Sequence, residues 1–151
     1  MIKVNVVLLP HAEDLPFPST ATIGSSGFDL IAAIEHGSCV ILKANGRALV
    51  PTGMLLHIPS GYEGQVRPRS GLALKYGVTV LNAPGTIDSD YRGEIQVLLI
   101  NHGTEDFVIT RGMRIAQLVI GPCIAVSFVA VDELDSSERG SGGFGSTGLR
   151  S

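Results

Sequence analysis

Tryptophan is absent from this sequence, and aromatic side chains make up only 5% of its 151 residues. Since hydrophobic residues still account for 44%, the apolar core has to consist of Val, Ile, Leu and Ala. Cysteine is also scarce, because Cys39 and Cys123 are too few for a disulfide framework. The sequence therefore favours a protein of a reducing compartment.

We expect neither a secretory leader nor a membrane span. The apolar start, residues 2–9, is short and is followed by acidic residues where a cleavage site would lie. The uncharged stretch 115–131 would reach only about 25 Å as a helix, against a hydrocarbon core of about 30 Å, and Gly121 and Pro122 interrupt it. We therefore expect a cytoplasmic protein without a membrane partner. We interpret the stretch as two strands, with residues 123–131 forming a second strand buried between subunits.

Positive charge is limited, and the formal net charge of -3 argues against binding to nucleic acid polymers. Most of the eleven basic residues are arginines, whose planar guanidinium suits phosphate oxygens. We therefore expect a small phosphorylated ligand, with scattered surface ion pairs as the alternative.

Long segments of helical periodicity are absent as well. Nineteen glycines and eight prolines in a chain of this length predict one all-β domain of many short strands. The expected strands are residues 2–9, a strand ending near 33, 39–43, 47–58, 78–82, 94–100 and one within 107–120. One short helix is predicted between Ser70 as N-cap and Gly77 at its C-terminal end.

The stretch 85–93 crowds two carboxylates, an aromatic ring and a guanidinium between two glycines, and we interpret it as a loop between strands. Asp88 and Asp90 copy the start of a calcium-binding EF-hand loop. Arg92 and Leu99 stand where that loop needs oxygen ligands, so the match fails. A solvated acidic turn is the alternative to a reactive site.

Two further stretches combine polar groups with glycine. Arg67 and Arg69 precede the predicted helix start. Together with the unpaired N–H groups of that helix end they would form an anion-binding site, and a capped surface turn with solvated arginines is the alternative. The Gly/Ser-rich end formally contains Gly-x-Gly-x-x-Gly at 143–148, but no strand precedes it and no helix can follow, so we reject a dinucleotide site. Arg139 and Phe144 in this tail suit closure over a phosphate and a flat ring.

Together these stretches resemble the five ordered motifs of the trimeric dUTP pyrophosphatases (dUTPases). They are residues 27–32, 67–73, 82–93, 111–117 and 139–148. The resemblance implies a jelly-roll-like β-barrel over residues 1–138, a flexible arm over 139–151 that closes the active site, and a homotrimer with shared sites. It also implies Mg²⁺-assisted hydrolysis of dUTP to dUMP and pyrophosphate, which supplies dUMP for dTTP synthesis and keeps uracil out of DNA.

Carried over by position, Asp88 would activate the water that attacks the α-phosphorus, and Asp29 would reach Mg²⁺ through water. Tyr91 would pack on the deoxyribose and exclude a 2′-OH. The other substrate contacts that the resemblance implies are Arg69, Ser70, Gly71 and Gln117 for phosphates, Asn82, Gly85, Thr86, Ile87 and Gln96 for uracil, and Arg139, Phe144, Ser146 and Thr147 from the arm.

Two alternatives share this fold. A dCTP deaminase would need a catalytic Glu at the position of Leu98, which cannot move protons. A nucleotide-binding module without turnover would need neither Asp88 nor the arm.

Overall fold

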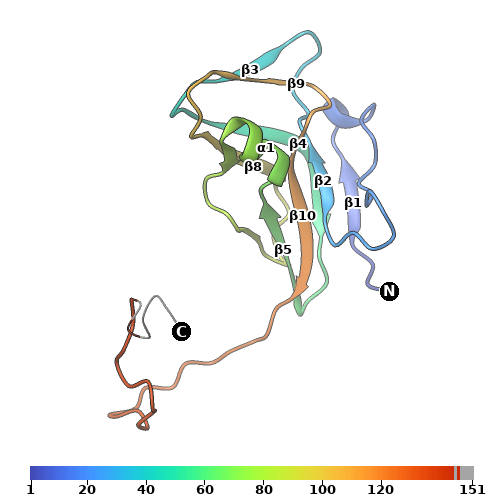
Figure 1. Ribbon diagram of the computed structural model, residues 1–151. Coiled ribbons are helices and arrows are strands. Elements are labelled where there is room, and N and C mark those ends of the chain that lie inside the picture. The colour runs from blue at the N-terminus through green and yellow to red at the C-terminus, as the bar shows by residue number, and fades with distance from the viewer. Residues whose placement is uncertain (145, 147–151) are drawn as a thin grey trace.

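The computed structural model describes residues 1–144 and 146 as two four-stranded antiparallel sheets, a two-stranded ribbon and one short α-helix (Figure 1). The first sheet has the order β1 (Asn5–Leu8), β4 (Arg47–His57), β8 (Glu94–Asn101), β6 (Val78–Val80). The second has the order β2 (Phe28–Ile31), β10 (Arg114–Pro122), β5 (Tyr62–Arg67), β7 (Gly85–Ile87). The ribbon pairs β3 (Cys39–Leu42) with β9 (Phe107–Thr110). A single turn of 3₁₀-helix, η1 (Pro10–Ala12), follows β1.

The two sheets share one apolar core, which is built from inward-facing residues of alternating strands. On β8 every second residue is buried, beginning with Ile95 and Val97, as expected for a strand with one face toward the core. Leu30 and Leu118 complete the core from the second sheet. The predicted all-β fold with an aliphatic core is therefore confirmed.

The helix α1 (Ser70–Tyr76) lies where the sequence predicts it. Gly77 ends it in the left-handed conformation at φ 68°, and its N–H bonds back to the carbonyls of Leu72 and Ala73. The predicted N-cap is wrong by one residue. The carbonyl of Arg69 already accepts the first helical bond, from the N–H of Ala73 at 3.1 Å, so Arg69 is the cap and Ser70 is the first helical residue.

Two predicted segments differ in the structure. Residues 85–93 are not wholly a loop, because Gly85–Ile87 pairs with β5 as an edge strand. Residues 123–131 form no strand, and all of them are exposed. A strand needs a hydrogen-bonded partner, and within the described chain this segment runs away from the body (Figure 1). None of the helices among the described residues is long and apolar enough to cross a membrane.

Asn101 is the one amide side chain among the fully buried residues that the structure describes. Its Nδ2 donates to the carbonyls of Leu42 (3.0 Å) and Glu105 (2.8 Å), and its Oδ1 accepts from the N–H of Gly103 at 2.8 Å. The side chain therefore joins the end of β8 to the ribbon and to the following turn, and it satisfies backbone groups that water cannot reach.

Replacing Asn101 by Ala should lower the free energy of unfolding by about 2–4 kcal/mol, because buried backbone groups lose their partners. Chemical denaturation at fixed protein concentration measures this loss. Asn5→Ala, which removes an exposed amide from β1, serves as the matched control. Equal stability of the two variants would contradict a structural role for Asn101.

Candidate active site

Three charged side chains from three elements meet at one end of the second sheet. Asp29 of β2 lies between Arg69, whose Nε is 3.1 Å from Oδ1, and Arg114 of β10, whose Nη1 is 3.1 Å from Oδ2. Arg69 also donates through Nη1 to the carbonyl of Arg114 at 3.0 Å. Two guanidiniums around one carboxylate leave a surplus positive charge, and the side chain of Arg114 is 56% exposed. This cluster is suited to an anion.

Gln117 lies beside this cluster on β10, where it stands opposite Asp29 in one ladder and Arg67 in the other. Its Nε2 donates to the carbonyl of Pro68 at 2.9 Å, so the half-buried amide has found a backbone partner. Gly27 lies directly beside this amide, since a Cβ there would overlap the Oε1 of Gln117. The structure thus brings Asp29, Arg69 and Gln117 together.

Ser70 and Gly71 extend this group as the first two residues of α1, and both are exposed. The Ser70 hydroxyl makes no hydrogen bond that caps the helix. Both residues therefore face solvent next to Arg69, in a position to contact a bound anion.

The second group of predicted residues lies at β7, the edge strand of the same sheet. Asn82 packs against Gly85. A Cβ on Gly85 would lie only 3.1 Å from the Nδ2 of Asn82, so glycine makes room for the amide. Thr86 is exposed and Ile87 is half-buried. Since β7 pairs on one side only, with β5, its outer edge leaves backbone N–H and C=O groups unpaired within the described chain.

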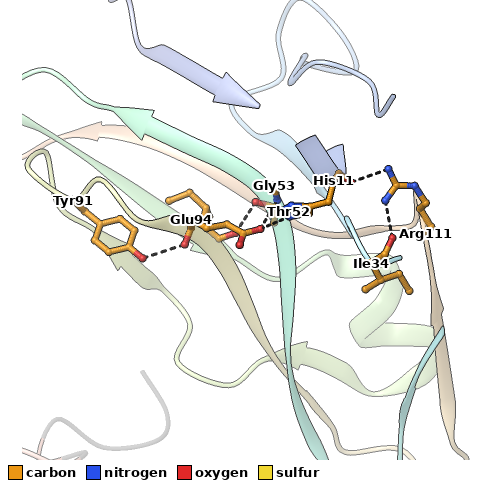
Figure 2. A network of polar contacts seen from close by, with 8 residues as sticks. His11, Ile34, Thr52, Gly53, Tyr91, Glu94 and Arg111 are labelled. Carbon is orange, nitrogen blue, oxygen red and sulfur yellow. Dashed lines mark hydrogen bonds and ion pairs between the residues drawn. The ribbon is translucent and has the colours of Figure 1, made fainter. Parts of the chain in front are cut away.

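Asp88 follows β7 directly and is exposed. Its carbonyl accepts the N–H of Tyr91 at 3.1 Å, which closes a turn. The Tyr91 hydroxyl donates to the carbonyl of Glu94 at 3.1 Å (Figure 2), and a Cβ on Gly93 would overlap the ring. Arg92 stabilises the same turn, because its Nη1 donates hydrogen bonds to the carbonyls of Ser89 (2.7 Å) and Tyr91 (2.8 Å).

Gln96 is not part of either group. It lies exposed on β8, in the first sheet, opposite Pro51 of β4.

The strand register separates the two groups within one chain. Gln117 pairs with Arg67 at one end of β5, whereas Ile87, the neighbour of Asp88, pairs with Gly64. Asp88 therefore lies four residues along from Arg67, or about 13 Å in the strand direction at about 3.3 Å per residue. The two groups therefore lie at different levels of the second sheet.

The described part of the arm lies far from both groups (Figure 1). Arg139 donates through Nε to the carbonyl of Gly142 at 2.9 Å, within a local turn, and Phe144 and Ser146 are exposed. Thr147 lies outside the described residues. One chain therefore does not bring the arm residues to the predicted site.

A directly bound metal does not fit the Asp29 group. Both carboxylate oxygens already accept from guanidiniums, and among the described residues no three His, Cys, Asp or Glu side chains cluster. A carboxylate oxygen keeps a second lone pair, so Asp29 still fits a water of a hydrated Mg²⁺. The donor set therefore supports an outer-sphere contact.

Sequence reasoning missed the polar residues that support Tyr91. Glu94 and His11 lie 3.0 Å apart through Oε1 and Nε2, and Arg111 donates to the carbonyl of His11 at 2.9 Å (Figure 2). Arg111 also binds Asp14, and this hydrogen bond holds the pKa of Asp14 below its usual range. No pattern in the sequence joins residues 11 and 94, because their contact depends on the fold alone.

Comparison with known proteins gives a consistent result. A family model described as dUTPase matches residues 13–148. Deoxyuridine 5'-triphosphate nucleotidohydrolases of Beijerinckia indica and Methylocella silvestris are each 58% identical, and the matches cover 97% of this chain and 91% and 92% of the relatives. The solved structure of the Staphylococcus bacteriophage 80alpha dUTPase with dUPNHPP is 27% identical and superposes with a TM-score of 0.84, covering 97% of this chain and 99% of that one. On the strength of the family model and of these relatives, the chain belongs to the dUTPase family.

Proposed function

We propose that this protein hydrolyses dUTP to dUMP and pyrophosphate in the cytoplasm, which supplies dUMP for dTTP synthesis and keeps uracil out of DNA. The observation that carries this proposal is the unpaired edge of β7, directly followed by Asp88 and Tyr91. Uracil, deoxyribose and α-phosphate are adjacent in dUTP, and the groups proposed to contact them, the β7 edge, Tyr91 and Asp88, are adjacent within residues 85–91.

The base is read by hydrogen bonds to the free backbone groups of β7, with Asn82 beside them. A backbone edge has fixed N–H and C=O positions, so it discriminates between pyrimidines by their pattern of donors and acceptors. Gln96 lies on the other sheet and would join this pocket only through its backbone. Tyr91 packs on the deoxyribose, and its ring leaves no room for a ribose 2′-OH.

Asp88 serves as the general base. Its carboxylate is exposed and carries no hydrogen bond within the described residues, so it can hold a water for in-line attack on the α-phosphorus. In phosphoryl transfer the protein needs to form few covalent bonds itself, and most of the rate acceleration comes from positioning the reactants. Arg69, Ser70, Gly71 and Gln117 hold the phosphates of the leaving group.

Magnesium is the implied cofactor, and bound Mg²⁺ neutralises charge on the phosphate oxygens. Asp29 contacts it through water, as its pairing with two guanidiniums requires.

The active site is completed by a second copy of the chain in a homotrimer. The separation of Asp88 from the Arg69 group within one chain supports this assembly, because catalysis needs both at one triphosphate. Exposed apolar side chains also support it, among them Phe128, which is 96% exposed in the segment 123–131. An apolar hollow of about 510 Å³ between β1 and β10 offers a matching surface.

The two alternatives are not favoured. Leu98 is a half-buried aliphatic residue on β8, paired with Leu49, and cannot act as a deaminase acid or base. A binding module without turnover would not need an open carboxylate at the end of β7. A pyrophosphate-release assay on dUTP, dCTP, dTTP and UTP tests all three, and only dUTP should be turned over efficiently.

Asp88→Asn should keep affinity for a non-hydrolysable dUTP analogue and lose about 10²–10⁴ in turnover, because the amide preserves shape but cannot accept the proton. Calorimetric binding and pyrophosphate release measure the two effects. Asp90→Asn, two residues along the same turn, is the matched control and should retain turnover within a few-fold. A variant with Asn at position 88 that hydrolyses dUTP within threefold of wild type would refute the assignment of the base.

Shared sites predict complementation between two inactive variants. Asp88→Asn and Arg69→Ala subunits, unfolded and refolded together, should form trimers in which about one quarter of the sites contain both intact halves. Pyrophosphate release should then return to about that fraction of wild type, and sedimentation should show a trimer. If each site lay within one chain, no mixture would regain activity.

Removal of residues 139–151 should leave a folded trimer with turnover reduced by about 10²-fold or more, because the arm excludes bulk water and places Arg139 beside the leaving phosphates. Phe144→Ala should reproduce part of this loss, whereas Ser136→Ala, just before the arm, should not. Steady-state kinetics and sedimentation measure both effects. Normal turnover of the truncated protein would show that residues 139–151 do not act as a lid.

A further inference from the structure

The pairing of β4 with β8 is interrupted beside the Tyr91 turn. Pro51 stands opposite Gln96, and the next pair is Leu55 with Glu94, so three residues of β4 face a single residue of β8. Gly53 within this bulge has φ 67°, and a Cβ there would overlap Ala12 of η1. Bulges next to functional sites commonly re-aim a neighbouring side chain.

Side chains replace the ladder bonds that the bulge loses. The Thr52 hydroxyl donates to the carbonyl of Ile95 at 2.6 Å, and the N–H of Gly53 donates to Oε1 of Glu94 at 2.7 Å. Thr52 and Gly53 are buried, and the Glu94 side chain is only 20% exposed. Glu94 is therefore tied down by its side chain at the point where β8 begins.

The same residue holds Tyr91 through its backbone. The carbonyl of Glu94 accepts the Tyr91 hydroxyl at 3.1 Å, while its carboxylate binds the bulge and lies 3.0 Å from Nε2 of His11 (Figure 2). Movement of Glu94 would therefore move the acceptor that orients the ring.

His11 is in turn fixed by Arg111, the first residue of the turn after β9. Arg111 donates through Nη1 to the carbonyl of Ile34 at 2.6 Å and through Nη2 to the carbonyl of His11 at 2.9 Å. Its side chain is 13% exposed and also pairs with Asp14. The chain of contacts thus runs from a largely buried arginine to the exposed ring of Tyr91.

We propose that Glu94 is a positioning residue for sugar discrimination: anchored by the β4 bulge and by His11, it holds the Tyr91 ring against the place of the ribose 2′-OH. This inference rests on the proposed function, in which Tyr91 packs on the deoxyribose. A tyrosine that is 44% exposed has little packing of its own to restrict it, so its orientation depends on the hydroxyl contact and on the space above Gly93.

The test combines kinetics with a signal from the ring itself. Glu94→Ala should lower the ratio of kcat/KM for dUTP to that for UTP about threefold to tenfold, because residue 94 keeps the carbonyl that accepts Tyr91 but loses the carboxylate contacts to Gly53 and His11 that fix it. Tyr91→Phe should produce a similar fall, and the double variant should fall no further, because both changes break the same connection. Glu94→Gln, which keeps the acceptor for the Gly53 N–H, should restore the ratio. Glu105→Ala removes an exposed carboxylate elsewhere and should leave it unchanged.

Fluorotyrosine NMR reports the ring without turnover, since the chain has only three tyrosines. In Glu94→Ala the Tyr91 resonance should shift and sharpen, while those of Tyr62 and Tyr76 stay in place and show that the fold is intact. An unchanged Tyr91 resonance together with an unchanged dUTP/UTP ratio would overturn the inference. If the wild-type protein did not hydrolyse dUTP, the proposed function would be wrong. The Tyr91 resonance in Glu94→Ala would still show whether Glu94 orients the ring.

Discussion

The ladders on both sides of β5 determine where the functional groups of this protein lie. β10 pairs along one edge and brings Gln117 to Arg67, while β7 pairs along the other and ends beside Gly64. Strand spacing fixes the backbones of Asp88 and Arg67 about 13 Å apart along the strand direction. A site that uses both groups within one chain would therefore have to extend along the sheet.

Charge placement follows from the same sheet. Asp29 and Gln117 stand opposite each other on β2 and β10, and Arg69 reaches them from the residue before α1. The carboxylate between two guanidiniums orients both of them and lowers their mutual repulsion, which keeps an arginine pair together in the absence of a ligand. Asp29 therefore holds Arg69 and Arg114 in place at this end of the sheet.

The first sheet contributes support for the site through its irregularity. A regular β4–β8 ladder would leave no N–H for the Glu94 carboxylate and no space for η1 above Gly53. The bulge provides both, and it connects His11 and Arg111 to the turn that presents Tyr91 (Figure 2). Glu94 and His11, which support this turn, lie outside the five motifs.

The sequence by itself determined the all-β class, the aliphatic core, the position of α1 with Gly77 at its end, and the identity of the motif residues, because these depend on local composition, turn chemistry and spacing. It missed β5, β7 and β9, placed the helix cap one residue late, and predicted a strand at 123–131 that the single chain does not form. Edge pairing and interfaces depend on partners distant in the sequence or in another subunit, and residue patterns do not record them. Only the tertiary structure decided that Asp29 pairs with Arg114, that Asp88 and Gln117 lie apart, and that Glu94 meets His11. Strand register decides the first two, and the β4 bulge with η1 decides the third, so that residues up to 85 positions apart meet.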